Sequence, residues 1–182
     1  KPIATATSVW SLIEDGKLGE ILELRGRGKE DKRGGGEDLW VLGSHVMNLI
    51  HFFGGEPKWC FATVEEGGQP VTKAHVKPGN EGIGPLAGDS VSAMYGLDGG
   101  EKAYFGSKRE AAGNRFGLQI FGSKGIVEIL TGHLPSAQFI ADPTLAGFNR
   151  NNLLPYNLFN RGAEPPLPPE SQRPGLYLDT ET

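Results

Sequence analysis

Apolar residues between Gly34 and Gly55 recur every three to four positions, a spacing that predicts an amphipathic helix. The segment begins with three glycines and then Glu37 and Asp38, two acids that favour the positive end of a helix dipole. Asp38 is also a candidate N-cap, and the terminal glycine pair can take the positive φ that ends a helix. The pattern predicts one helix with both ends marked. Its apolar positions are Leu39, Leu42, Val46, Leu49, Ile50 and Phe53.

The rest of the pattern predicts one more helix and several strands joined by short turns. A short helix is predicted over residues 4–15 and is ended by Gly16. Alternating apolar and polar residues predict strands, two pairs of which are close enough to form hairpins. The fold class that follows is α+β, an open, largely antiparallel β-sheet with helices packed on one face. The predicted strands lie within residues 19–28, 57–66, 89–97, 101–109, 115–122 and 125–132.

Two segments lack a sustained period. Residues 73–89 form a glycine- and proline-rich loop that is longer than compact domains usually keep without a use. From residue 134 onward prolines are frequent, and we expect an extended arm that could include one short helix. We therefore divide the chain into an α+β domain, residues 1–133, and a proline-rich arm of the same domain, residues 134–182.

Composition narrows the function classes. A chain of 182 residues with 37% hydrophobic residues can fill the core of one domain. The net charge of -4 and the lack of a basic tract argue against nucleic acid as a partner. No run approaches about 20 apolar residues, so we expect no membrane partner and a soluble chain. A single cysteine, Cys60, excludes an internal disulfide and fits a cytoplasmic location. On its strand, Cys60 is expected to be a small buried hydrophobe.

His45 is the candidate for chemistry on the predicted helix. It lies at the edge of the apolar stripe, so its ring is expected to be half buried. A histidine side chain titrates near neutral pH and can act as a general acid or base, or hydrogen-bond a hydroxyl. The alternative is a core-edge histidine bonded to a backbone carbonyl. Gly43 costs about 1 kcal/mol in a helix interior, which suggests that something approaches the backbone there.

The segment GKEDKRGGG, residues 28–36, places five charges and four glycines just before this helix. A solvated loop is the default interpretation of such a run. Because it precedes the helix that carries His45, its cations could instead bind a carboxylate or hydroxyl groups of a ligand. The candidates for that role are Lys29 and Arg33.

Four segments, in order, resemble the C-terminal domain of the Gfo/Idh/MocA oxidoreductases, the glucose-fructose oxidoreductase and inositol dehydrogenase group. They are DGKLGEILELRGRGK, GGGEDLWVLGSHVMNLIHFFGG, GDSVSAMYGLDGGEKAYFGS and RFGLQIFGSKGIVEIL, and together they cover about residues 8–130. Members of this family join an N-terminal Rossmann domain, which holds NAD or NADP, to a C-terminal α/β domain. That second domain supplies substrate contacts and often an oligomer interface on its sheet face.

The resemblance implies roles for individual residues. His45 corresponds to the catalytic histidine of the family. Many members carry an aspartate four residues before it and another three residues after it, where this chain has Val41 and Asn48. If the chain acts on a substrate, its loop and strand-end cations would orient that substrate, and the expected substrate-binding residues are Lys29, Arg33, Asp38, Asn48, Lys108 and Arg109.

The chain has no GxGxxG segment between a strand and a helix, so it lacks the sequence mark of a Rossmann domain. We therefore expect this chain to be the second domain alone, with NAD or NADP bound mainly by the missing domain. By itself it should neither bind the cofactor nor turn over.

Three functions are compatible with these observations. The first is the substrate and oligomerisation domain of an NAD(P)-dependent oxidoreductase acting on a sugar or polyol, with a homodimer as the smallest assembly. The second is a non-enzymatic sugar-binding or assembly module, which Val41 and Asn48 permit. The third is a metal hydrolase using His45 and His51. Six residues apart on a helix, these two histidines point about 120° from each other, which argues against a metal site.

Overall fold

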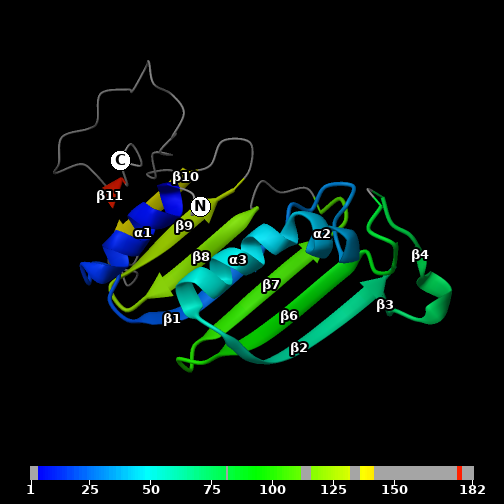
Figure 1. Ribbon diagram of the computed structural model, residues 1–182, viewed down its shortest axis with the longest axis horizontal. Helices are drawn as coiled ribbons and strands as arrows, with labels where there is room; N and C mark the ends of the chain where they lie inside the picture. The colour runs from blue at the N-terminus through cyan, green and yellow to red at the C-terminus, as the bar shows by residue number, and fades with distance from the viewer. Residues whose placement is uncertain (1–3, 81, 112–115, 132–135, 142–175, 178–182) are drawn as a thin grey trace, which may run out of the picture. The chain divides into compact units, whose positions relative to one another are not determined.

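The computed structural model describes residues 4–80, 82–111, 116–131, 136–141 and 176–177. In this part of the chain, three α-helices accompany a mixed, mostly antiparallel β-sheet (Figure 1). The α+β class predicted from the sequence is confirmed. The chain divides into two compact units, Glu23–Leu118 and the pair of segments Lys1–Leu22 and Gln119–Thr182.

In the unit formed by Glu23–Leu118, the strand order is β1-β7-β6-β2-β3. β1 runs parallel to β7, with Glu23 opposite Lys102, and the other neighbours are antiparallel. The β6–β7 hairpin and the turn at Gly67-Gly68 lie where the sequence predicts them. The strands are β1 Ile21–Arg27, β2 Pro57–Glu66, β3 Gln69–Pro70, β6 Ser90–Leu97 and β7 Lys102–Lys108.

Two helices, α2 (Gly36–Val41) and α3 (Gly43–Gly54), lie over one face of this sheet (Figure 1). Val46, Leu49, Ile50 and Phe53 of α3 are buried, as are Leu24, Val91, Ala93 and Phe105 of the strands. A Cβ atom at Gly26 of β1 would lie 2.5 Å from Cγ1 of Val46. Glycine at this position therefore lets α3 pack directly on the strand backbone.

The prediction of one continuous helix from Gly34 to Gly55 is wrong, because α2 ends at Val41 and α3 begins at Gly43. A Cβ at Gly43 would lie 2.9 Å from both the backbone oxygen of Asp38 and Cζ of Phe105, so the chain turns where it meets β7. The predicted N-cap is also wrong. The N-cap is Gly35, without a side-chain hydrogen bond, while the C-terminal glycine signal is confirmed by Gly55 at φ 78°.

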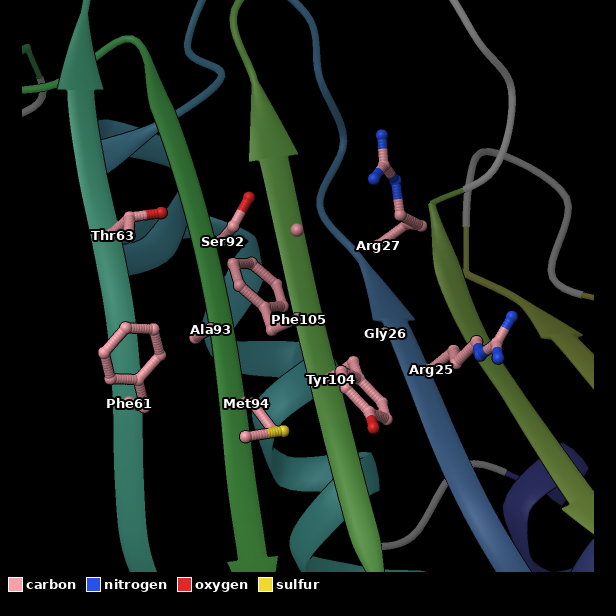
Figure 2. Close-up of a pocket in the computed structure, with 11 residues that line it drawn as sticks. Arg25, Gly26, Arg27, Phe61, Thr63, Ser92, Ala93, Met94, Tyr104 and Phe105 are labelled. Carbon is pink, nitrogen blue, oxygen red and sulfur yellow. The ribbon is translucent and has the colours of Figure 1, made fainter. Parts of the chain in front are cut away.

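The opposite face of this sheet, which we call the open face, carries side chains of alternate residues of β1, β7, β6 and β2 (Figure 2). The strand register aligns these residues in rows. One row runs Phe61, Met94, Tyr104, Arg25, and the next runs Thr63, Ser92, Gly106, Arg27. Phe61 is 66% exposed, so a large aromatic side chain lies uncovered on this face.

The glycine- and proline-rich loop contains structure of its own. A 3-10 helix, η1 (Lys73–His75), is followed by two short antiparallel strands, β4 (Lys77–Pro78) and β5 (Pro85–Leu86). The side-chain amide of Asn80 donates to both carboxylate oxygens of Glu37, at 2.8 and 3.0 Å. The loop is thus fastened to the first turn of α2.

In the other unit, the strand order is β11-β10-β9-β8 and α1 contacts β10. The predicted helix and hairpin are confirmed, and Ser123 and Lys124 of the hairpin turn donate backbone hydrogen bonds to Glu20 and Leu18. The pattern assigned no element to β10, which pairs with β9. The elements are α1 Ala4–Glu14, β8 Gly117–Gly122, β9 Gly125–Leu130, β10 Ser136–Ala141 and β11 Leu176–Tyr177.

Most of the proline-rich arm, residues 142–175 and 178–182, lies outside the described residues, so its predicted extended structure and the boundary at residue 133 remain predictions. None of the described helices is long and apolar enough to cross a bilayer.

Candidate functional site

His45 is the third residue of α3 and is exposed, so the expectation of a half-buried ring is wrong. The buried side of α3 is centred on Val46, Ile50 and Phe53, which turns His45 away from the sheet. Asn48, one helical turn further on, is exposed as well and lies beside His45 on the helix surface. Both side chains are therefore available to a ligand or to another protein surface.

The position where many family members carry an aspartate, Val41, belongs to a different helix from His45. α2 ends at Val41, and Leu42 separates it from α3. The backbone N–H of Leu42 donates to Asp38, and that of His45 donates to Leu42. No carboxylate at position 41 orients the imidazole of His45.

Asp38 is fully buried and joins three segments of the chain. Its Oδ2 accepts hydrogen bonds from the hydroxyl of Ser107, at 2.6 Å, and from the backbone N–H of Lys29, at 2.9 Å. The hydroxyl of Ser107 in turn accepts from the N–H of Gly35, at 3.1 Å. Burial raises the pKa of Asp38, while the bonds from Ser107 and Lys29 act in the opposite direction. We call these four residues the Asp38 cluster.

Glycine is required beside the Asp38 cluster. A Cβ at Gly28 would lie 1.9 Å from Oδ2 of Asp38, and one at Gly34 would lie 2.4 Å from backbone atoms of Lys108 and Arg109. The backbone N–H of Glu110 also donates to the carbonyl of Asp31, at 3.0 Å. Residues 28–36 are therefore packed against the end of β7 and do not form the loose solvated loop that charge alone suggests.

This packing brings together the cations that the sequence singled out. Lys29 and Arg33 lie on the packed loop, and Lys108 and Arg109 lie at the end of β7 against it. Arg33 forms a 2.9 Å ion pair with Asp31, and hydrogen bonds from Arg33 are the main reason that the pKa of Asp31 falls to about 2. Lys29 and Lys108 are exposed.

The sequence analysis missed three polar residues at this end of the sheet. Ser107 is 2% exposed and Glu30 is also 2% exposed, although both side chains are polar. Glu30 accepts from the side chain of Arg27 and from the backbone N–H of Lys108. Glu66 binds Lys77 at 2.9 Å and lies 3.7 Å from Arg109. The only sequence signal for Ser107 was its strand phase, which it shares with the buried Phe105 and Ala103.

Among the cavities that the described residues of this unit line, two bear on the candidate site. One, of about 430 Å³, lies on the open face between Arg27, Thr63, Ser92 and Tyr104 (Figure 2). The other, of about 270 Å³, lies beside α3 and includes Asn48, His51, Glu56 and Tyr95 in its lining. We call this second cavity the α3 pocket. His45 is in neither lining. In the described part of the chain, no group of three or more potential metal ligands could hold an ion.

The family model described as GFO/IDH/MocA C-terminal domain matches residues 7–128. The chain belongs to this family. The match includes most of α1, the Asp38 cluster, α3, the β6–β7 hairpin and most of the β8–β9 hairpin of the GFO/IDH/MocA domain. It confirms the resemblance inferred from the four sequence segments. No curated protein matches the sequence significantly.

Solved structures show the same fold at low identity. An NAD binding oxidoreductase from Klebsiella pneumoniae is 18% identical, with a TM-score of 0.55 over 86% of this chain and 45% of its own. Levoglucosan dehydrogenase in complex with NADH and levoglucosan is 19% identical, with a TM-score of 0.52 and coverages of 79% and 42%. An inositol dehydrogenase homolog from Azotobacter vinelandii, with NADH and myo-inositol, is 14% identical, with a TM-score of 0.53 and coverages of 78% and 38%.

The GFO/IDH/MocA domain described here spans less than half the length of these solved chains. Its candidate residues fall into two groups. His45 and Asn48 lie on the exposed side of α3, whereas Lys29, Arg33, Lys108 and Arg109 gather where the loop 28–36 meets the end of β7. Asp38 lies beneath the second group, buried from solvent.

Proposed function

We propose that this chain is the substrate-binding and oligomerisation domain of an NAD(P)-dependent oxidoreductase that acts on a sugar, a polyol or a related hydroxy compound. The observation that carries the proposal is the family match over residues 7–128. It is supported by matched structures that hold NADH together with levoglucosan or myo-inositol. The dinucleotide would be held mainly by a second domain outside this sequence.

His45 is the group proposed to move the proton. The chemistry that a bound NAD or NADP would supply is acceptance of a hydride from the carbon that bears the reacting hydroxyl. One ring nitrogen of His45 would accept the proton of that hydroxyl, and the exposure of His45 on α3 is compatible with substrate approach. Asn48, one turn along the same surface, would hydrogen-bond a neighbouring hydroxyl.

The cations at the end of β7 would orient the substrate. Lys29 and Lys108 are exposed and can donate to hydroxyl or carboxylate oxygens, with Arg33 and Arg109 beside them. Asp38 has no exposed surface, so we propose that it acts by fixing the backbone of Lys29 through its 2.9 Å hydrogen bond and does not touch the substrate.

The open face is the proposed surface for a homodimer or a higher homo-oligomer. Trp59 is 44% exposed and Phe61 is 66% exposed on β2, and the two described helices of this unit, α2 and α3, lie over the other face of the sheet (Figure 1). An uncovered aromatic face of this kind commonly marks an interface.

The proposal is tested on the full reading frame that encodes this chain. The frame is expected to encode a strand-GxGxxG-helix unit, and its product is expected to reduce NAD or NADP in the presence of a sugar or polyol. His45→Ala should lower kcat by about a hundredfold or more, because general acid-base catalysis contributes that much. His75→Ala, in η1, is the matched control and should leave kcat unchanged.

A non-enzymatic sugar-binding module is the second candidate, favoured by Val41 in place of an aspartate. This candidate predicts a reading frame without a nucleotide-binding unit and sugar binding that does not depend on a dinucleotide. Unchanged turnover of His45→Ala in an active enzyme would remove His45 from the catalytic role.

A further inference from the structure

We propose that the α3 pocket is a binding site for a small, uncharged compound with several hydroxyl groups; it shares Asn48 with the surface that carries His45, and its other polar residues are His51, Glu56 and Tyr95. The pocket lies between the second half of α3, the turn after it and strands β2 and β6. The inference rests on the geometry of these residues and does not depend on the proposed oxidoreductase function.

A histidine with a carboxylate partner lies on one side of the pocket. Nε2 of His51, in the last turn of α3, lies 2.9 Å from Oε1 of Glu56, just after the helix. The pair is accessible, with side chains 56% and 64% exposed. A histidine held through Nε2 keeps Nδ1 for another hydrogen bond, and the carboxylate has further acceptor positions. His51 therefore has the partner that His45 lacks at position 41.

Two further polar residues line the same pocket, one from β6 and one from α3. Tyr95 comes from β6; its phenolic hydroxyl already bonds the thiol of Cys60 on β2, and a phenol can both donate and accept. Asn48 comes from α3, one turn before His51, and offers an amide with two donors and an acceptor. Residues that carry an imidazole, a carboxylate, a phenol and an amide thus line one small volume, and each of these groups can bond a hydroxyl group.

The remaining lining is largely apolar. Met47 and Ile50 contribute from α3, Leu97 from β6 and Pro57 from β2. A few converging polar groups above an apolar surface are typical of small-molecule sites. The same combination suits a polyol ring, whose hydroxyls lie at the edge and whose C–H groups form the faces.

Size and charge limit the ligand further. The volume of about 270 Å³ corresponds to roughly nine water molecules at about 30 Å³ each, which is enough for a six-carbon ring with its hydroxyls. Glu56 is the acidic residue of the lining, and no lysine or arginine lines the pocket. An anion would face this carboxylate without a fixed cation to balance it, so uncharged ligands are favoured over anionic ones.

The α3 pocket and the proposed catalytic surface share Asn48, but His51 and His45 belong to one each. His45 precedes His51 by six residues, and the two side chains point about 120° apart around the helix axis. Binding at one position can therefore be distinguished from binding at the other by which residues respond.

The test is an NMR titration of the ¹⁵N-labelled 182-residue chain with myo-inositol, and with D-gluconate as an anion of similar size. The expected result is saturable shift changes at His51, Glu56 and Tyr95 with myo-inositol, and at least about tenfold weaker binding of gluconate.

Two variants sharpen the test. Tyr95→Phe removes one hydroxyl and should raise Kd by about 2- to 10-fold, the value of one neutral hydrogen bond. His51→Ala should raise it at least as much. The matched control is His75→Ala, which removes an imidazole bonded to Thr72 in η1 and should leave Kd unchanged.

Three results would overturn the proposal: no saturation at these residues below about 50 mM myo-inositol, equal binding of gluconate, or a Kd that neither Tyr95→Phe nor His51→Ala changes. Saturable shifts confined to the surroundings of His45 would also overturn it while supporting the proposed function. Loss of activity in the full-length His45→Ala protein, with the α3 pocket still binding myo-inositol, would support both.

Discussion

The hydroxyl of Ser107 donates a 2.6 Å hydrogen bond to the carboxylate of Asp38, and both side chains are buried. The two residues are 69 positions apart, so this bond fixes the start of α2 to the end of β7. Through Lys29 and Gly35 the same pair also holds the loop that carries the candidate substrate cations. The position of that loop depends on a buried polar cluster more than on its own charges.

Removing either member of this pair should destabilise the domain. Asp38→Ala leaves the Ser107 hydroxyl and the Lys29 N–H without their acceptor, and we expect a loss of about 2–4 kcal/mol in the free energy of unfolding. Ser107→Ala should cost about 1–3 kcal/mol. Urea denaturation measures both. Asp15→Asn, at a side chain 58% exposed, is the control and should change the value by less than about 0.5 kcal/mol.

The two aspartates of this region should give opposite pH dependences of stability. The pKa of Asp31 is lowered to about 2, chiefly by hydrogen bonding from Arg33, so the folded chain binds fewer protons than the unfolded chain. Its contribution is complete above the unfolded value of 3.8 and is lost as the pH falls toward 2. Burial raises the pKa of Asp38, so its contribution is complete below 3.8 and declines as the pH rises above it.

Denaturation curves measured from pH 2 to 7 test these signs. Asp31→Asn should flatten the rise in the free energy of unfolding between pH 2 and 4. In the parent chain the contribution of Asp38 to the free energy of unfolding declines above pH 4. Asp38→Asn removes this decline, so the free energy of unfolding of the variant should rise more, or fall less, above pH 4. A parent-like pH profile in both variants would contradict the assignment of these shifts.

The break between α2 and α3 gives another prediction. On helix propensity alone, Gly43→Ala should stabilise the chain by about 1 kcal/mol. The new Cβ, however, would lie 2.9 Å from the Asp38 carbonyl and from Phe105, so we expect a net loss of about 1–3 kcal/mol. Thermal or urea unfolding measures the difference. Asn48→Ala, at an exposed position on the same helix, is the control and should be neutral or slightly stabilising. A stabilised Gly43→Ala chain would contradict the prediction, because the Asp38 carbonyl and Phe105 would then have moved to admit the new Cβ at little cost.

The elements that local signals define were predictable from the sequence. The Gly67-Gly68 turn and the β6–β7 hairpin follow from glycine positions and from alternation over a few residues. The parallel pairing of β1 with β7 was not predictable in this way, because it joins Glu23 to Lys102 across most of the unit and has no local sequence mark.

The site was predicted less completely than the fold, for physical reasons. The sequence singled out His45 as a candidate but predicted a half-buried ring. The pattern alone could not show that the buried stripe of α3 is centred on Val46 and Ile50. It treated Asp38 as a cap, whereas its partner Ser107 lies on a distant strand. Cys60, expected to be buried, is exposed because β2 lies beyond the cover of the helices. Long-range packing decides each of these cases.

The open face gives a prediction about assembly. If Phe61 is buried between two copies of the chain, Phe61→Asp places a carboxylate in that interface on each copy and should raise the dissociation constant of the oligomer by about a hundredfold or more. Sedimentation equilibrium over a range of concentrations measures this constant. Val76→Asp, at an apolar side chain 50% exposed near η1, is the matched control and should leave assembly unchanged. If the oligomer persists in Phe61→Asp but is weakened by Val76→Asp, the interface lies on the loop that carries β4 and β5. If the parent chain is a monomer, the open face is left for a partner other than a second copy.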